Sequence, residues 1–74
     1  METHNHYQTE SHEQLLIKEV LRRRDVSVLA QMLRVSKKSV YRWINGEYKP
    51  HISAYKLLLD IRNRDRNKHD LSQN

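Results

Sequence analysis

The feature that most constrains this chain is a pair of short amphipathic segments, residues 26–33 and 37–45, that meet at a polar turn. The only glycine, Gly46, and the only proline, Pro50, follow the second segment directly. Glycine readily adopts the left-handed conformation that ends many helices, and proline disfavours helix at the residue before it. We therefore expect two short helices joined by a tight turn, with a sharp exit after the second.

The second of these segments has two chemically different sides. Val40, Trp43 and Ile44 share one side at helical spacing, which predicts that Trp43 lies in the core and is not a surface for base stacking. The opposite side carries three cations and a hydroxyl: Lys37, Lys38, Ser39 and Arg42. One face of this helix can be buried while the other is offered to an anionic partner.

Polar caps mark where the first three predicted helices begin. Ser11 with Gln14 three residues later forms the pattern of a capping box, which predicts a helix from about residue 12 to 24. Asp25 and Ser36 are the expected N-caps of helices over about 26–33 and 37–45. The first helix would end in three arginines, Arg22 to Arg24. These arginines either complement the helix dipole or contact phosphate, and the sequence leaves both interpretations open.

A fourth helix is predicted from about residue 51 to 63, after Pro50. Its core stripe is expected to consist of Ile52, Tyr55, Leu58 and Leu59. Leu57 and Ile61 lie beside this stripe, where they either widen the buried face or form a second apolar strip. In the second case they would support a homodimer through this helix.

The chain is long enough for one domain, and no repeat or strand-like alternation is present. We expect a disordered arm over residues 1–10, a four-helix domain over 11–64 and a flexible tail over 65–74. Neither a membrane span nor a signal peptide is expected, and the absence of cysteine fits a reducing compartment. The predicted location is therefore cytoplasmic.

No combination of residues that usually supports catalysis is present. There is no activated nucleophile, no carboxylate pair and no glycine-rich phosphate loop, so no enzyme activity, cofactor or small-molecule ligand is expected. His4, His6 and His12 lie in or near the polar arm without a preorganised partner, and we expect no metal site there.

Positive charge is concentrated in the middle of the chain. Residues 22–50 contain eight Lys and Arg against two acidic residues, whereas residues 1–21 contain one Lys against four Glu. This distribution indicates a basic face built into the fold, as opposed to a basic tail.

The spacing of Leu29-Ala30, Val40, Trp43, Gly46 and Pro50 resembles the helix-turn-helix of the phage-repressor-like family (Cro and repressor type, also called XRE type). That family places a small residue where Ala30 stands, so that two helices approach closely. Two departures are visible. Many members have glycine in the turn where this chain has Arg34, and members commonly have a fifth helix. A left-handed residue other than glycine costs about 1–2 kcal/mol.

The resemblance implies an all-α, lambda-repressor-like domain whose third helix lies in the DNA major groove. It implies base contacts from Lys37, Lys38, Ser39 and Arg42, with Arg42 the first choice for reading guanine because of its rigid fork. The expected DNA backbone contacts are Gln31, Arg34, Ser36, Tyr41, Asn45, Tyr48 and Lys49. Tyr48 is alternatively a surface ring packed on Pro50, and Tyr41 is alternatively exposed to solvent without a role.

The function expected from these features is sequence-specific binding of double-stranded DNA by a transcriptional regulator, with repression by steric occlusion of a promoter. Such a protein is expected at the nucleoid when it is bound to DNA. Helix-turn-helix proteins usually bind as dimers on half-sites about one helical turn apart. Two other classes remain open. One is a protein-interaction module, such as an antitoxin or adaptor that uses the same basic surface. The other is an RNA-binding or genome-packaging role.

Overall fold

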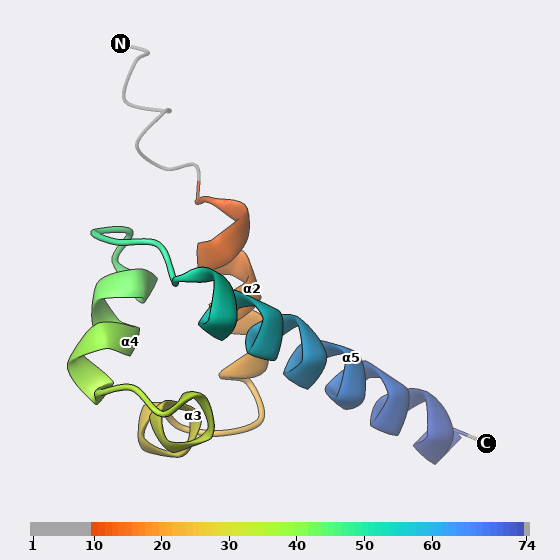
Figure 1. Cartoon of the computed structure of the whole chain (residues 1–74). Coiled ribbons are helices and arrows are strands. Elements are labelled where there is room, and N and C mark those ends of the chain that lie inside the picture. Colours follow the sequence, from red (N-terminus) through yellow and green to blue (C-terminus); the bar gives the residue numbers. More distant parts are fainter. Residues whose placement is uncertain (1–9, 74) are drawn as a thin grey trace, which may run out of the picture.

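The computed structural model describes residues 10–73, and these residues form four helices and no strand. The helices are α2 (His12–Val20), α3 (Val26–Leu33), α4 (Lys37–Ile44) and α5 (Ile52–Gln73). α3 and α4 form a corner on one side of α2, while α5 packs on α2 and then continues past the other helices (Figure 1). The expected all-helical class is confirmed. The predicted arm over residues 1–10 lies outside the described residues except for Glu10.

α2 begins at the predicted capping box. The Ser11 hydroxyl accepts a hydrogen bond from the Gln14 backbone at 3.1 Å, and the Gln14 side chain accepts one from the Ser11 backbone at 2.9 Å. The predicted end near residue 24 is wrong, because the helix stops at Val20 and Leu21 is its C-cap. Arg22 to Arg24 instead belong to the connection that turns toward α3.

α3 and α4 begin where their polar caps predicted. The Asp25 carboxylate accepts from the Val28 backbone at 2.9 Å, and the Ser36 hydroxyl accepts from the Ser39 backbone at 3.1 Å. The predicted bounds of α3 are confirmed. α4 ends one residue earlier than predicted, because Asn45 is its C-cap.

α5 differs most from the sequence-based prediction. It extends to Gln73, so the expected helix end near residue 63 is wrong. The segment predicted as a flexible tail, residues 65–74, is helical through residue 73. Asp65 is only 6% exposed and is held by Arg24, which anchors the helix beyond the predicted end.

The buried stripe of α5 is also rotated from the expected one. Ala54, Leu58 and Ile61 are buried, whereas Ile52 is 65% exposed. Tyr55 and Leu59, also predicted for the stripe, are partly buried at its edge. A stripe chosen from large apolar side chains misses Ala54, whose small size lets helix backbones approach closely.

A single core joins the four helices. α2 packs against α4 and α5, and α3 packs against the same two helices. Trp43 is buried, as predicted. Ile61 is buried within this core too, so it is not part of a free strip for a second copy of the chain. The core residues are Leu16, Ile17, Val20, Leu29, Ala30, Leu33, Val40, Trp43, Ala54, Leu58 and Ile61. Among residues 10–73, no helix is long and apolar enough to span a bilayer.

Candidate nucleic-acid interface

The outward face of α4 carries the residues predicted to contact bases. Val40 and Trp43 fix the inward face of the helix, and Lys37 and Lys38 are exposed on its first turn. Ser39 and Arg42 are half-buried. Ser39 Oγ lies 3.1 Å from the hydroxyl of the N-cap residue Ser36, so the two hydroxyls form one small polar group at the start of α4.

The turn between α3 and α4 is closed by a left-handed residue. Arg34 has φ 60° and ψ 45°, so this residue adopts the left-handed conformation although it is not a glycine. Its N–H donates to the Gln31 carbonyl at 3.2 Å, and the next N–H, from Val35, donates to the Ala30 carbonyl at 3.0 Å. The Arg34 side chain is exposed beside the start of α4.

The end of α4 repeats this arrangement with glycine in the left-handed position. Gly46 has φ 80°, and its N–H donates to the Trp43 carbonyl at 3.1 Å. The N–H of Glu47 then donates to the Arg42 carbonyl at 2.9 Å. Hydrogen bonds to the carbonyls three and five residues back thus end both helices, in the pattern of a Schellman motif.

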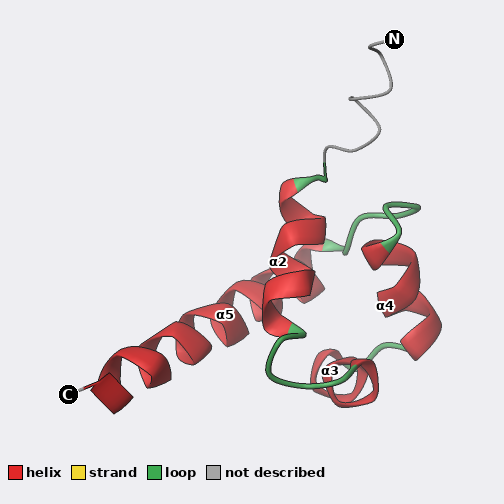
Figure 2. Cartoon of the chain, turned by 180° about the vertical axis from the view of Figure 1, so that it is seen from behind, coloured by secondary structure: helices red, strands yellow, loops and turns green. Residues whose placement is uncertain are grey.

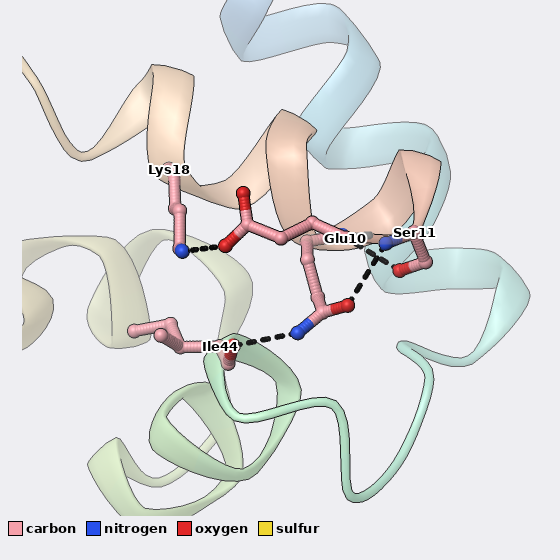
Figure 3. A network of polar contacts seen from close by, with 5 residues as sticks. Glu10, Ser11, Lys18 and Ile44 are labelled. Atoms are coloured by element: carbon pink, nitrogen blue, oxygen red, sulfur yellow. Dashed lines mark hydrogen bonds and ion pairs between the residues drawn. The ribbon is translucent and has the colours of Figure 1, made fainter. Parts of the chain in front are cut away.

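A side chain from α2 holds the last turn of α4. Gln14 Nε2 donates to the Ile44 carbonyl at 3.0 Å while its Oε1 accepts from Ser11 (Figure 3). Figure 3 also shows the ion pair between the side chains of Glu10 and Lys18. A methyl group at Gly46 would lie 2.9 Å from Gln14 Nε2, so a larger residue would displace the Gln14 side chain in addition to being strained at the positive φ. Capping by Gln14 is predictable from sequence, but its contact with α4 is not.

The predicted backbone-contacting residues are all exposed, and they border α4. Tyr41 and Lys37 line a shallow hollow together with Ser27 at the start of α3. Tyr48 lies beside Arg42, with the guanidinium carbon 5.4 Å from the centroid of its ring. No hydrogen bond or ion pair in the described part of the chain joins the side chains of Gln31, Asn45 or Lys49 to the other candidate residues.

The cations of α4 differ from two arginines of α5 that are paired with carboxylates. Among residues 10–68, whose side chains the structure describes, no carboxylate forms a salt bridge with Lys37, Lys38 or Arg42. Within this part of the chain their charge is therefore available to a ligand. On α5, by contrast, Arg66 binds Glu19 through two hydrogen bonds of 2.8 and 2.9 Å, and Arg64 pairs with Asp60 at 2.9 Å. The hydrogen bonds from Arg66 hold the pKa of Glu19 below its ordinary value.

Arg24 is the one arginine of the Arg22–Arg24 run with a clear structural role. Its guanidinium binds Asp65 through hydrogen bonds of 2.7 and 2.9 Å and donates to the Val20 carbonyl at 2.7 Å. These contacts outweigh partial burial and hold the pKa of Asp65 below its usual range. The signal that could have revealed the pair is the helical phase of Asp65, which matches that of Ala54, Leu58 and Ile61.

Among the described residues, no three acidic, His or Cys side chains cluster as a metal site would require. His12 Nε2 instead lies 2.9 Å from the hydroxyl of Tyr55. His51, at the start of α5, accepts a hydrogen bond from the Ala54 backbone through Nδ1 at 3.3 Å, as an N-cap does. His4 and His6 lie outside the described residues.

No protein-family model, curated protein or solved structure matches the chain. We therefore infer function from the residues and from their geometry.

Proposed function

We propose that this protein binds double-stranded DNA in a sequence-specific manner, with α4 in the major groove, and that it regulates transcription as a repressor. The observation that carries the proposal is the division of α4 between two faces. Val40 and Trp43 hold one face in the core, and Lys37, Lys38 and Arg42 leave the other face positively charged. A helix of this kind can enter the major groove without disturbing the domain.

The surroundings of α4 supply groups that suit DNA phosphates. Arg34 and Lys49 are exposed at its two ends, and Ser27 and Tyr41 border its first turns. Phosphate contacts fix the orientation of a protein on the duplex, whereas contacts to base edges give sequence preference. Lys37, Lys38, Ser39 and Arg42 are proposed for the bases, and Gln31, Arg34, Ser36, Tyr41, Asn45, Tyr48 and Lys49 for the backbone.

We propose further that two copies of the chain bind adjacent half-sites, as is usual for helix-turn-helix proteins. Only Leu57 remains available of the two residues expected to support a dimer, because Ile61 is only 6% exposed in the single chain. Leu57 itself is 43% exposed on α5. A dimer through this helix would therefore use Leu57 and its polar neighbours.

Selection of bound sequences from a random duplex library tests the proposal directly. We expect one enriched site, with two symmetric halves if a dimer binds. Affinity for that site should fall steeply with salt, with a log–log slope of about −0.9 per phosphate contact. No enrichment, together with no salt-dependent duplex binding, would contradict the proposal and favour a protein partner. Stronger binding to RNA than to any duplex would favour the RNA-binding class.

A further inference from the structure

The side chain best suited to read a base is held against an aromatic ring. The guanidinium carbon of Arg42 lies 5.4 Å from the centroid of the Tyr48 ring. Arg42 is half-buried, while Tyr48 is 59% exposed. The ring therefore buries little of its surface in the core. Among the described contacts, its aromatic surface interacts with the guanidinium of Arg42.

The backbone brings Tyr48 back alongside α4. Gly46 reverses the chain with φ 80°, and the N–H of Glu47 donates to the carbonyl of Arg42 itself at 2.9 Å. The segment that carries Tyr48 is thus bonded to the residue whose side chain the ring contacts. The hydrogen bond from Gln14 to the Ile44 carbonyl holds the last turn of α4 in place beneath this reversal.

We propose that Tyr48 is a positioning residue, and that its ring orients Arg42 for the recognition of guanine. This inference rests on the proposed DNA-binding function and assigns one part of its specificity. An aromatic ring interacts with a face of the planar guanidinium group. The N–H groups at the edge of that plane stay free to donate to guanine O6 and N7. The two interactions therefore do not compete for the same atoms.

The ring also reduces the conformational entropy that the Arg42 side chain loses on binding DNA. A long side chain on a helix surface samples many rotamers, and ordering it opposes recognition. A contact that restricts the guanidinium before DNA binds lowers this entropic cost. The proposed role needs only the ring, whereas a phosphate contact by Tyr48 would need its hydroxyl.

Base discrimination by Tyr48 variants tests the proposal. The probes are the duplex selected by the wild-type protein and duplexes in which each guanine is replaced in turn. The Arg42→Ala variant identifies the guanine that Arg42 reads, because discrimination at that position is lost. Good bidentate contacts discriminate between bases by about 5- to 150-fold. Tyr48→Ala should lower discrimination at the same position by about two- to fivefold, the range of an exposed cation–π contact.

Three comparisons separate positioning from other roles. Tyr48→Phe keeps the ring and should retain wild-type discrimination. Adding Tyr48→Ala to Arg42→Ala should change discrimination no further, because the residue that is positioned is already absent. Tyr41→Ala removes an exposed tyrosine from α4, the helix that carries Arg42. No described contact places a guanidinium over the ring of Tyr41. Because Tyr41 is itself a proposed backbone contact, this variant should lower affinity equally on every duplex and leave discrimination at the Arg42 position unchanged.

Several results would overturn the inference. Tyr48 is also one of the proposed backbone contacts. Equal loss of affinity on every duplex for Tyr48→Ala, reproduced by Tyr48→Phe, would restrict Tyr48 to that phosphate contact. Undiminished discrimination in a folded Tyr48→Ala variant would show that the ring does not act through Arg42, and Tyr48→Leu would replace that variant if it failed to fold. If the wild-type protein selects no duplex, the proposed function itself fails. That result is distinguishable because it precedes any variant.

Discussion

Two residues with the same backbone conformation end the two helices of the corner, and they differ in how well they suit it. Arg34 has φ 60° and Gly46 has φ 80°, and each is followed by a hydrogen bond to the carbonyl five residues before. Glycine adopts this conformation without the steric cost that a side chain adds. Arg34 therefore carries strain that Gly46 does not.

Replacing Arg34 by Gly should raise the free energy of unfolding by about 1 kcal/mol, since relief of left-handed strain exceeds the added entropy of glycine in the unfolded chain. Urea unfolding measures the change. The same variant should bind DNA more weakly, because a proposed phosphate contact is removed. A glycine variant no more stable than wild type would contradict the assignment of strain to Arg34.

Gly46→Ala is the matched variant at the other helix end. It should lower the free energy of unfolding by at least about 1–2 kcal/mol, since alanine is strained at positive φ. Its Cβ would also lie 2.9 Å from Gln14 Nε2, which must then move. The two substitutions make opposite changes at equivalent left-handed positions of two helix ends. If both changed the free energy of unfolding in the same direction, φ would not decide their effect.

At the scale of the helices, local signals were enough for α3 and α4 but not for α5. Asp25, Ser36 and Gly46 act on neighbouring backbone groups, so their effect could be predicted from sequence. The packing of α5 beyond residue 64 involves a pair of residues 41 positions apart, Arg24 and Asp65. The composition of residues 65–73 resembles that of a polar tail, and only the helical phase of Asp65 points to a partner.

The candidate site shows the same difference between local features, which the sequence predicts, and contacts between distant residues, which it does not. The cations of α4 follow from periodicity and from the family resemblance, and their exposure could be predicted. The contact of Arg42 with Tyr48 depends on how the chain reverses after Gly46, and that of Gln14 with Ile44 on how α2 crosses α4. Sequence spacing does not determine such placements between elements.

Asp65→Asn tests the anchoring of α5. Removing one charge of a buried pair leaves Arg24 without its partner, and we expect a loss of about 3 kcal/mol at pH 7. The folded pKa of Asp65 is lowered from 3.8, so its contribution is present above that pH and is lost as the pH falls through the folded pKa. The stabilities of wild type and Asp65→Asn, measured by urea unfolding from pH 7 to 2, should therefore converge at acid pH.

Asp60→Asn serves as the control for this experiment. Asp60 pairs with Arg64 one turn along the same helix, and both side chains are more than half exposed. Exposed pairs contribute little to stability. A loss at Asp60 as large as that at Asp65 would indicate a general effect of charge on α5 and not a specific anchor.

Gln14→Glu tests the link between α2 and α4. Glutamate keeps an oxygen for the Ser11 backbone but removes the donor to the Ile44 carbonyl, and it places negative charge at the negative end of α4. We expect a loss of about 1–3 kcal/mol in the free energy of unfolding. Gln14→Ala, which removes both contacts without adding charge, is the comparison. If Gln14→Glu unfolds like wild type, the bond to Ile44 contributes nothing to stability.

For the whole molecule, cations on the two sides should contribute differently to DNA binding. Lys49, one of the proposed backbone contacts, is exposed after the end of α4, and Lys68 is exposed near the end of α5. Figure 2 shows that this end of α5 extends away from the other helices. Lys49→Gln and Lys68→Gln lower the net charge equally. Only the first should reduce the magnitude of the log–log salt slope, by about 0.9 if one phosphate contact is lost. Equal slopes for both variants would indicate attraction by net charge alone.

The long-range anchor of α5 also has a consequence for the order of folding. α3 and α4 are joined by three residues, whereas Arg24 and Asp65 close a loop across 41 positions, which carries a larger entropic cost. Contacts between near neighbours are expected to form first, and docking of α5 to complete the structure. In stopped-flow experiments, Asp65→Asn should therefore accelerate unfolding much more than it slows folding. The lifetime of the native state would then be set at the end of the chain farthest from the proposed DNA surface.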